Sequence, residues 1–486
     1  MRNRKIDLYK KYPHDFQEKT LQYLLSKAKN TDFGILYNFN KLTSYNDFRD
    51  HLPIMSYDDL LPYVHKIRKG RRNVLWPGKV SFFAKSSGTT NQRSKYIPIT
   101  KESLIDCHFK AGKDMLSLYC NNFIHNNIFN GKSLMLGGSI SLNNKYKYID
   151  GDLSAILIKN FPYWVSLHRS PDLKTSLLQD WDKKIIETCN QSIKENITSI
   201  TGVPSWTLVL MNKILDVTGA RNIQEVWPNL ELYMHGGVNF EPYRSQFENL
   251  FPSNHMNYLQ GYIASEGFFA IQDLKSSDDM LLMLDYGIFY EFIALDNFAN
   301  ESNDYLPLRD VELDEVYVIV ISTNGGLWRY VIGDTIRFTC LDPYRIKVVG
   351  RTSSYINVFG EELMVENTDK ALSECCIIHN CHVREYTVAP EYIDGSAGKH
   401  KWLIEFDIMP DDINNFRVDL DLELQKLNSD YAAKRSGNHV ISELKLDVLA
   451  SGHFYRWLKK YRNVGVQNKI PRLSNDDKIY NQILEI

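Results

Sequence analysis

The sequence has little net charge, and no stretch of it stays apolar for long. Its 57 basic residues nearly balance 59 acidic ones over 486 residues, which leaves a formal net charge of -2. Proteins whose main partner is a nucleic acid or an anionic membrane surface usually carry a marked basic excess. We therefore expect no nucleic acid and no membrane as a partner, and a small molecule as the ligand.

The few cysteines and the missing hydrophobic segments bear on the compartment. The seven cysteines are odd in number and irregularly spaced, unlike the disulfide framework of a secreted protein. No run of about eighteen apolar residues is long enough to cross a membrane. The charged residues 1–10 are not followed by an apolar core of signal-peptide length. These absences predict a cytoplasmic protein.

The two common glycine-rich nucleotide motifs are also missing. Gly-x-x-x-x-Gly-Lys-Ser/Thr does not occur, and no Gly-x-Gly-x-x-Gly follows a strand pattern. What is present is a cluster of hydroxyl side chains around one glycine, formed by Ser86, Ser87, Gly88, Thr89 and Thr90. Hydroxyls and closely spaced N–H groups suit an anion such as phosphate, and Lys95 supplies a positive charge. Taken alone, the cluster also fits a polar surface loop between two strands.

Apolar periodicity predicts an α/β fold. Over residues 1–300, strand patterns alternate with amphipathic helix patterns, as in a strand over 80–84 and a helix over 101–119. A further helix over 56–69 is expected to begin at the capping residues Ser56 and Asp58.

The chain is too long for one hydrophobic core, so at least two domains are expected. The patterns change near residues 352–355, where we place the boundary. Residues 1–352 then form a large N-terminal domain that binds the ligands, and residues 353–486 form a small C-terminal domain.

Two segments combine strand ends with groups that suit a nucleotide. Residues 232–237 are expected to form a strand that ends on Gly236 and Gly237, where a ligand can lie against the backbone. Residues 258–267 combine tyrosines and a serine with one acid, Glu266. Mg2+ commonly takes one or two carboxylates with phosphate and water, so Glu266 is a candidate metal ligand. The alternative is a helix-capping or salt-bridged glutamate.

Further candidate groups follow near residue 330. Asp334 comes directly after Gly333 and is placed to accept hydrogen bonds from ribose hydroxyls. Trp328 or Tyr330 is expected to shape an adenine pocket, and Arg351 adds a positive charge just before the predicted boundary.

A cluster of thiols and imidazoles is formed by Cys375, Cys376, His379, Cys381 and His382. These are ligand types that zinc prefers. Two of the cysteines are adjacent, however, and no second pair lies at a finger-like distance. A helix end that passes into a strand explains the same residues as packing.

Four longer motifs occur in sequence order: Ala84-Lys-Ser-Ser-Gly-Thr-Thr90, Ala264-Ser-Glu-Gly-Phe-Phe269, Asp285-Tyr-Gly-Ile-Phe-Tyr-Glu291 and Tyr330-Val-Ile-Gly-Asp334. Together they resemble the GH3 family of acyl acid amido synthetases, and more closely its bacterial branch. The resemblance extends over nearly the whole chain. It implies an α/β fold distantly related to the adenylate-forming ligases, with a large multi-sheet N-terminal adenylating domain, a small mobile C-terminal domain and an active site between them.

The resemblance implies an enzyme that uses ATP and Mg2+ in two half-reactions. A carboxylic acid attacks the α-phosphate of ATP, releasing pyrophosphate and leaving an acyl adenylate. An amine, usually that of an amino acid, then displaces AMP and forms an amide. The expected partners are therefore a small carboxylic acid and an amine, and we expect the protein to be a monomer.

The resemblance also implies residue roles. Residues 86–90 hold the phosphates, Gly236 and Gly237 flank the adenine, Tyr262 and Ser265 contact the nucleotide, Asp334 binds the ribose, and Arg351 supports it. Glu266 holds the metal. Lys469, in a polar loop that ends at Pro471, moves in with the C-terminal domain to neutralise charge during adenylation.

For the acyl pocket, Trp206 and Tyr163 are candidate lining residues, although buried aromatics in an α/β domain are more often core. Two other functions remain open. An acyl-CoA-type ligase would pass the acyl group to a thiol and form a thioester. A catalytically inactive nucleotide-binding protein would act as a sensor or interaction module.

Overall fold

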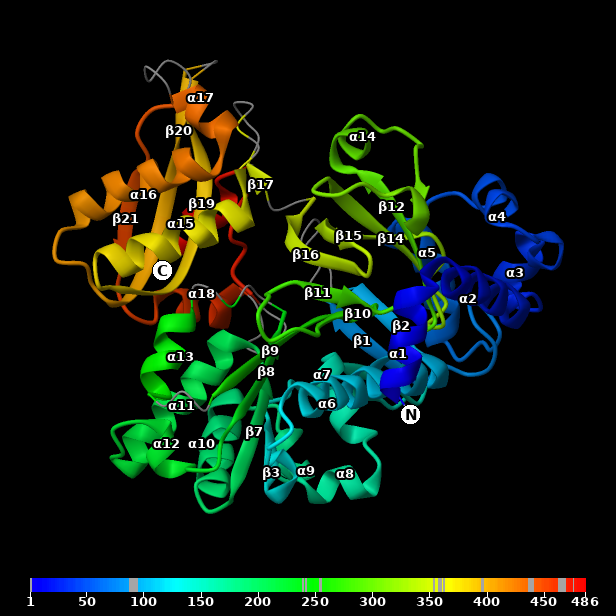
Figure 1. The fold of residues 1–486 in the computed structure, drawn as a ribbon, viewed down its shortest axis with the longest axis horizontal. Helices are drawn as coiled ribbons and strands as arrows, with labels where there is room; N and C mark the ends of the chain where they lie inside the picture. The colour runs from blue at the N-terminus through cyan, green and yellow to red at the C-terminus, as the bar shows by residue number, and fades with distance from the viewer. Residues whose placement is uncertain are drawn as a thin grey trace. The chain divides into compact units, whose positions relative to one another are not determined.

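The computed structural model describes most of the chain. The described residues are 2–86, 95–237, 240, 243–252, 256–352, 355–356, 361, 363–394, 397–435, 441–461, 469–474 and 476–486. They form two compact units (Figure 1). The first unit comprises Met1–Gly202, Trp227–Gly237 and His255–Val348, and the second comprises Val203–Val226, Val238–Asn254 and Val349–Ile486. The predicted domains, 1–352 and 353–486, are each one continuous range, whereas each compact unit is built from separate stretches of the chain. The domain boundaries stay a prediction.

The first unit begins with helices. They are α1 (Arg2–Lys11), α2 (Pro13–Ala28), α3 (Asp32–Leu36), η1 (Phe39–Lys41), α4 (Tyr45–His51) and α5 (Tyr57–Arg68). The predicted start of α5 at Ser56 is confirmed, because the Ser56 hydroxyl accepts a hydrogen bond from the Asp59 N–H. The acid that completes this capping box is Asp59 and not the predicted Asp58, since only the third helical residue reaches back to the N-cap.

A four-stranded sheet follows, in the order β2 (Lys95–Ile99), β1 (Phe82–Ser86), β5 (Tyr148–Gly151) and β4 (Ile140–Asn143). After β2 the chain enters η2 (Ser103–Phe109), a π-helical segment, and continues as α6 (Lys110–Asn122). The predicted helix over 101–119 is therefore present, and its first part has the wider π-helical turn over Ser103–Phe109. The predicted strand over 80–84 is present two residues later, as β1.

A second, twelve-stranded sheet starts with parallel strands. These are β6 (Arg169–Ser170), β3 (Lys132–Met135), β7 (Ile197–Gly202), β8 (Leu232–Gly236) and β9 (Asn257–Ala264). The connections contain η3 (Ile128–Asn130), α7 (Leu153–Lys159), α8 (Tyr163–Leu167), α9 (Leu173–Ser176) and α10 (Trp181–Ser192). Because parallel strands share one direction, β7, β8 and β9 all end at the same edge of the sheet.

The sheet continues from β9 through β10 (Gly267–Gln272), β11 (Met280–Leu282), β16 (Tyr344–Arg351), β15 (Tyr330–Leu341), β14 (Val316–Thr323), β12 (Ile288–Ala294) and β13 (Leu306–Pro307). Pairs such as β9–β10 and β12–β14 are antiparallel. The short helices α14 (Leu295–Ala299) and η5 (Leu308–Asp310) complete this part. The predicted α/β class with more than one sheet is confirmed.

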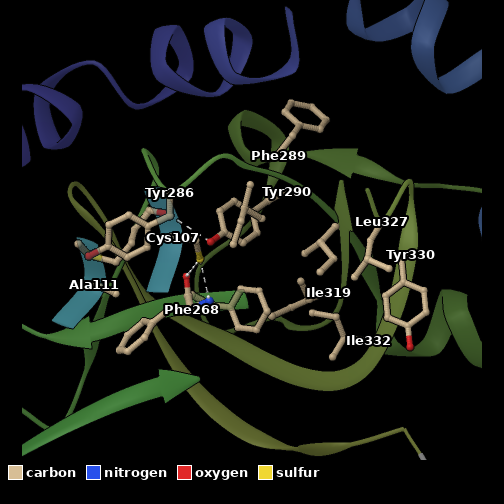
Figure 2. Close-up of a cluster of buried hydrophobic side chains, with 14 of the residues drawn as sticks. Cys107, Ala111, Phe268, Tyr286, Phe289, Tyr290, Ile319, Leu327, Tyr330 and Ile332 are labelled. Carbon is tan, nitrogen blue, oxygen red and sulfur yellow. Dashed lines mark hydrogen bonds between the residues drawn. The ribbon is translucent and has the colours of Figure 1, made fainter. Parts of the chain in front are cut away.

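This antiparallel part curls around a hydrophobic core. β10 and β12 are five strand steps apart, or about 24 Å in a flat sheet at about 4.8 Å per step. The rings of Phe269 and Tyr290 nevertheless pack with their centroids 6.4 Å apart. Figure 2 shows the enclosed side chains, with Tyr290 and Phe268 close to Cys107 of η2. The Cys107 sulfur accepts a hydrogen bond from the Phe268 N–H at 3.3 Å, and burial raises the pKa of this thiol to about 12.

The second unit is built on the three-stranded sheet of β19 (His382–Asp394), β20 (Ala397–Ile408) and β21 (Lys445–Leu449). Its other elements are α11 (Pro204–Thr218), α12 (Ile223–Val226), α13 (Arg244–Leu250), β17 (Tyr355–Ile356), β18 (Leu363–Met364), α15 (Val365–Ile378), α16 (Ile413–Leu427), α17 (Ser429–Arg435), α18 (His453–Tyr461) and α19 (Lys478–Leu484).

Helices cover both faces of this sheet, because successive side chains of a strand point to opposite sides. Trp402 and Ile404 of β20 join the core beneath α15 and α16, which lie across the strands in Figure 1. Lys401 points the other way and donates a hydrogen bond to Asp477, next to α19, at 3.2 Å. Within the described part of the chain, every helix is too short or too polar to span a membrane.

A partly buried network of charges fastens α1 to the rest of the first unit. Arg2 donates to Asp114 at 2.6 Å and to Asp285 at 2.7 Å, and Lys110 contacts Asp285 at 2.9 Å. Burial alone would raise the pKa of Asp285, but hydrogen bonds and charges from Arg2 and Lys110 outweigh it and lower the pKa. At the other end of α1, Lys10 contacts Asp273 at 2.8 Å, and the pKa of Asp273 is lowered in the same way, with Arg345 as a second partner.

Acid should therefore destabilise the first unit. The folded-state pKa values of Asp285 and Asp273 lie below the ordinary 3.8, so their contribution to stability is present above that pH and is lost as the pH falls through the folded-state values. Arg2→Met should lower the unfolding free energy at neutral pH by about 1–3 kcal/mol, because it removes charged hydrogen bonds from buried carboxylates. The difference in unfolding free energy between this variant and the wild type should shrink as the pH falls below 3.8.

Thermal or urea unfolding followed by circular dichroism measures this effect. Arg221→Met is the matched control, because the Arg221 side chain is 91% exposed and its ion pair with Glu225 is a surface pair. A difference between Arg2→Met and the wild type that stays constant down to low pH would contradict the assignment to carboxylate pairing.

Candidate active site

The predicted phosphate loop connects β1 and β2. These strands form an antiparallel hairpin whose last pair is Ser86 with Lys95. Ser87, Gly88, Thr89 and Thr90 lie outside the described residues, as does the side chain of Ser86. Their roles therefore stay a prediction. The strand pairing does fix where the loop leaves and rejoins the small sheet.

Lys95 connects the small sheet to the large one. Its ammonium group donates a hydrogen bond to the Tyr330 hydroxyl at 3.3 Å and lies 5.7 Å from the centre of the Tyr57 ring. Tyr330 is the first residue of β15 and is fully buried. The lysine at one end of the predicted phosphate loop is thus held at the start of the strand that carries Asp334.

The glycines at the end of β8 permit a close approach of two strands. Gly236 pairs with Gly261 of β9, and a Cβ added to Gly236 would lie 2.3 Å from the Gly261 carbonyl oxygen. Gly237 follows with φ +83°, a backbone conformation that residues other than glycine rarely adopt. Both residues lie at the carboxyl edge of the parallel strands, the usual ligand side of such a sheet. Backbone packing alone requires Gly236, and its contact with adenine stays a prediction.

The next candidates lie on the hairpin between β9 and β10. Ala264 pairs with Gly267, so Ser265 and Glu266 form a two-residue turn at the same edge of the sheet as Gly237. Ser265 is buried, and Glu266 is half-buried. The helix-capping alternative for Glu266 is wrong, because the residue belongs to a strand hairpin and not to a helix start.

Asp334 is presented by a bulge in β15. Val318 of β14 pairs with Thr335, and Val320 pairs with Val331, so β15 contains two extra residues opposite this part of β14. Gly333 makes the bulge possible with φ +88°. The bulge turns the carboxylate of Asp334, which is 9% exposed, away from the regular strand pattern.

The structure brings Asp334 together with Tyr262. The Tyr262 hydroxyl donates a hydrogen bond to the Asp334 carboxylate at 2.7 Å. β9 and β15 are four strand steps apart, about 19 Å in a flat sheet, so only the curl of the sheet allows this contact. Tyr262 also packs against Phe269, with ring centroids 4.8 Å apart, which restricts its ring. Two predicted nucleotide residues therefore form one rigid pair.

Trp328 does not shape an adenine pocket. It is fully buried, its indole N–H donates to the Leu75 carbonyl at 3.1 Å, and its ring packs against Phe33 and Phe39. The sequence suggested a ligand role because the tryptophan stands close to Asp334. Its contacts instead place Trp328 in the core of the first unit.

A buried ion pair beside this tryptophan was missed by the sequence analysis. Arg329 donates to Glu291 at 2.8 Å and to the Leu52 carbonyl at 2.5 Å, and both side chains are nearly inaccessible to solvent. Burial raises the pKa of Glu291 despite the arginine. Removing one partner of such a pair typically costs about 3–5 kcal/mol. The available signal was Glu291 itself, a single acid within the apolar strand 288–294.

The predicted residues Lys469 and Arg351 belong to the second unit. Arg351 is the last residue of β16. Lys469 is exposed and is followed by the anchored segment 470–474, in which Ile470 and Leu473 are buried. Leu473 pairs with Val388 of β19 as an isolated parallel bridge. The backbone next to the predicted catalytic lysine is thereby fixed.

The two candidate acyl-pocket residues lie in different environments. Trp206 of α11 is 6% exposed and packs edge-on against Tyr455, with ring centroids 6.5 Å apart, within the second unit. Tyr163 of α8 belongs to the first unit and is 81% exposed. Trp206 therefore has the surroundings of a core residue, whereas Tyr163 is on the surface. Their acyl-binding role stays a prediction.

The cysteine and histidine cluster contacts protein groups. Cys375 and Cys381 are buried in the core of the second unit, and burial raises the pKa of the Cys375 thiol, which disfavours the thiolate that zinc requires. His379 contacts Asp419 at 2.7 Å, and His382 contacts the Ser245 hydroxyl at 3.0 Å. Across the described ranges, no three His, Cys, Asp or Glu side chains are grouped so that they could hold a metal ion.

Family models match three successive parts of the chain. The N-terminal domain of the GH3 family matches residues 2–256, its central domain matches residues 281–351, and its C-terminal domain matches residues 365–478. The chain belongs to the GH3 family. The resemblance to the GH3 family drawn from the four sequence motifs is confirmed, and the place in its bacterial branch stays a prediction.

Named relatives of this GH3 chain are plant enzymes at low identity. Indole-3-acetic acid-amido synthetase GH3.4 of Arabidopsis thaliana is 22% identical over 91% of this chain and 85% of its own length. Jasmonoyl-L-amino acid synthetase JAR4 of Nicotiana attenuata is 22% identical over 94% of this chain and 90% of its own length.

Solved structures share the fold of the GH3 chain. GH3.15 acyl acid amido synthetase superposes with a TM-score of 0.79 at 15% identity, covering 97% of this chain and 93% of that one. 2-Hydroxyisobutyryl-CoA ligase in the postadenylation state gives a TM-score of 0.60 at 12% identity, covering 96% and 90%. These two likenesses confirm the predicted fold.

The pairing of Tyr262 with Asp334 gives a testable prediction. Tyr262→Phe removes the hydroxyl that orients the carboxylate, so we expect the KM for ATP to rise about tenfold, corresponding to one hydrogen bond to a charged group. Steady-state kinetics at varied ATP concentration measures the effect. Tyr258→Phe, four residues earlier on the same strand, is the control. An unchanged KM for ATP in Tyr262→Phe would contradict the proposed role of the Tyr262 hydroxyl in orienting the Asp334 carboxylate for the nucleotide.

Proposed function

We propose that this GH3 protein is an ATP-dependent acyl acid amido synthetase, which activates a carboxylic acid as an acyl adenylate and then transfers the acyl group to an amine, most simply that of an amino acid. The observation that carries the proposal is the hydrogen bond between Tyr262 and Asp334, 72 residues apart in sequence, near the carboxyl edge where Gly237 and Glu266 also lie. Membership of the GH3 family and the named amido synthetases among its relatives support the reaction class.

In the first half-reaction, a carboxylate oxygen of the acid attacks the α-phosphorus of ATP. The bond from this phosphorus to the bridging oxygen breaks, and pyrophosphate leaves with that oxygen. A carboxylate at neutral pH has no proton to lose, so the protein has to align the two reactants and stabilise negative charge. Hydroxyls and N–H groups of residues 86–90, with Lys95 and Lys469, suit that task.

In the second half-reaction, the amine nitrogen attacks the carbonyl carbon of the adenylate. The bond between this carbon and the AMP oxygen breaks, AMP leaves with one oxygen of the original carboxylate, and the nitrogen releases a proton. No covalent intermediate with the protein is required. The groups that bind AMP in the first step, Asp334 and Tyr262 among them, keep the leaving group in place for the second.

Glu266 is the proposed ligand of Mg2+. The fit rests on its half-buried place in the β9–β10 turn, next to the buried Ser265. A dedicated cluster of carboxylates is not needed, because Mg2+ is commonly held by one or two carboxylates together with phosphate oxygens and water. When bound, the ion would offset charge on the phosphates.

A thioester-forming ligase remains the second candidate, because 2-hydroxyisobutyryl-CoA ligase shares the fold. The two candidates differ in what releases AMP from the adenylate. An amide-forming enzyme releases AMP when an amine is added, and a thioester-forming enzyme releases it when a thiol such as coenzyme A is added.

We also propose a cytoplasmic location, supported by the free thiol state of all seven cysteines. The monomeric state stays a prediction.

Acid-dependent exchange of labelled pyrophosphate into ATP tests the first half-reaction by itself. The wild type should catalyse exchange with at least one class of carboxylic acid. Lys469→Ala should slow exchange by about a hundredfold, because removal of a group that stabilises developing charge lowers kcat. ATP binding should stay nearly unchanged, since this lysine acts mainly in the transition state.

Lys460→Ala, an exposed lysine of α18 in the same unit, is the control for Lys469→Ala and should exchange like the wild type. Exchange that is unaffected in Lys469→Ala would remove this lysine from the mechanism. The proposed function would be contradicted if the wild type catalysed pyrophosphate exchange with none of the carboxylic acids tested.

The Mg2+ assignment has its own test. Glu266→Gln keeps the size of the side chain and removes its charge, so the Mg2+ concentration for half-maximal ATP binding should rise about tenfold, as expected for the loss of one carboxylate ligand. Titration calorimetry of ATP binding at varied Mg2+ measures it, with Glu248→Gln on α13 as the control. A normal Mg2+ titration in Glu266→Gln would contradict the assignment.

A further inference from the structure

The segment that follows Lys469 lies alongside β19 and is joined to it by an isolated parallel bridge between Leu473 and Val388. The Val388 N–H donates to the Arg472 carbonyl at 2.8 Å, and the Ser474 N–H donates to the Val388 carbonyl at 3.1 Å. The Thr387 hydroxyl donates to the Pro471 carbonyl at 2.6 Å. This backbone is thus fixed by three hydrogen bonds within the second unit.

Arg472 holds the same segment through its side chain. Its guanidinium group contacts the Glu385 carboxylate at 2.5 Å and donates to the Tyr243 hydroxyl at 2.8 Å. It also lies over the ring of Tyr386, 4.3 Å from the ring centre. Glu385 and Tyr386 belong to β19, and Tyr243 directly precedes α13, so one side chain connects three parts of the second unit.

The charges in this contact depend on each other. Burial raises the pKa of Glu385, and the nearby positive charge of Arg472 opposes that effect. Tyr243 is 2% exposed, and burial raises the pKa of its hydroxyl, which therefore stays a donor or acceptor of hydrogen bonds and not an anion. A guanidinium group provides several donors in a fixed plane, which a lysine in this position would not provide.

Arg472 is also close to the predicted catalytic lysine along the chain. The two positions are three residues apart along the chain. An extended chain covers at most about 3.6 Å per residue, so their Cα atoms are no more than about 11 Å apart. Ile470, directly after Lys469, is 5% exposed and cannot move outward without exposing its side chain. The Arg472 contacts therefore constrain the backbone position from which the Lys469 side chain extends.

We propose that Arg472 is a positioning residue for Lys469: its contacts with Glu385, Tyr243 and Tyr386 hold segment 470–474 on β19 and so fix the lysine for the adenylation step. This inference rests on the proposed function. Arg472 touches no reacting atom in this account and acts only through Lys469.

A double-mutant cycle tests the inference. In pyrophosphate exchange, Arg472→Met should lower kcat by about tenfold to a hundredfold, since a misplacement of about 1 Å costs rates of that order, with a nearly unchanged KM for ATP. If Arg472 acts through Lys469, the double variant Arg472→Met with Lys469→Met should be no slower than Lys469→Met alone. Losses that multiply would overturn the proposal.

Two further variants separate positioning from folding. Tyr243→Phe keeps the ion pair and removes one hydrogen bond, so it should fold, and its smaller loss of kcat should likewise vanish in the Lys469→Met background. Arg417→Met removes an ion pair with Glu443 on the surface of the same unit and should leave exchange unchanged. A loss in Arg417→Met equal to that in Arg472→Met would overturn the specific role.

Hydrogen–deuterium exchange measures the anchoring without any substrate. In Arg472→Met, the Val388 and Ser474 amides should exchange faster than in the wild type, because their hydrogen bonds join β19 to the anchored segment. Unchanged amide exchange in Arg472→Met would overturn the proposal, whatever the rate of pyrophosphate exchange in that variant. A wild type without pyrophosphate exchange would instead contradict the proposed function, and the amides would still report whether Arg472 anchors the segment.

Discussion

The hydrogen bond between Tyr262 and Asp334 depends on the curl of one sheet, and the packed core of the first unit maintains that curl. The two residues come from strands four steps apart, and the aromatic core shown in Figure 2 fills the space that the curled strands enclose. The bulge at Gly333 then aims the carboxylate at the tyrosine. Geometry at the candidate site is therefore a property of the whole sheet, since no local segment could produce it.

The second unit supplies a different kind of order. Segment 470–474 has no regular secondary structure of its own and is held by β19 and by the guanidinium group of Arg472. Lys469 stands at the exposed end of that anchored segment. A flexible lysine side chain on a fixed backbone suits a group that must meet charge only at one stage of a reaction, because the backbone contributes no further entropy cost.

Local signals in the sequence predicted the strand ends, the capping serine of α5 and the candidate residues Gly236, Tyr262, Glu266 and Asp334. Each depends on neighbours in the chain, such as a glycine after a strand. The interpretation of Trp328 was wrong because closeness in sequence to Asp334 says nothing about the direction of its side chain. Arg329 lies 38 positions from Glu291, and Arg472 lies 87 positions from Glu385. The single acid Glu291 in an apolar strand was a local signal that a partner is needed, but no local pattern names the partner in either pair.

The central claim is that a carboxylic acid is activated by bonding to the α-phosphorus of ATP. Mass spectrometry of AMP formed from an acid labelled with 18O in its carboxylate tests this directly. The account predicts that each AMP carries one labelled oxygen and that the amide keeps the other, because the bond between carbonyl carbon and oxygen breaks in the second step. Unlabelled AMP, or label found in inorganic phosphate, would contradict it.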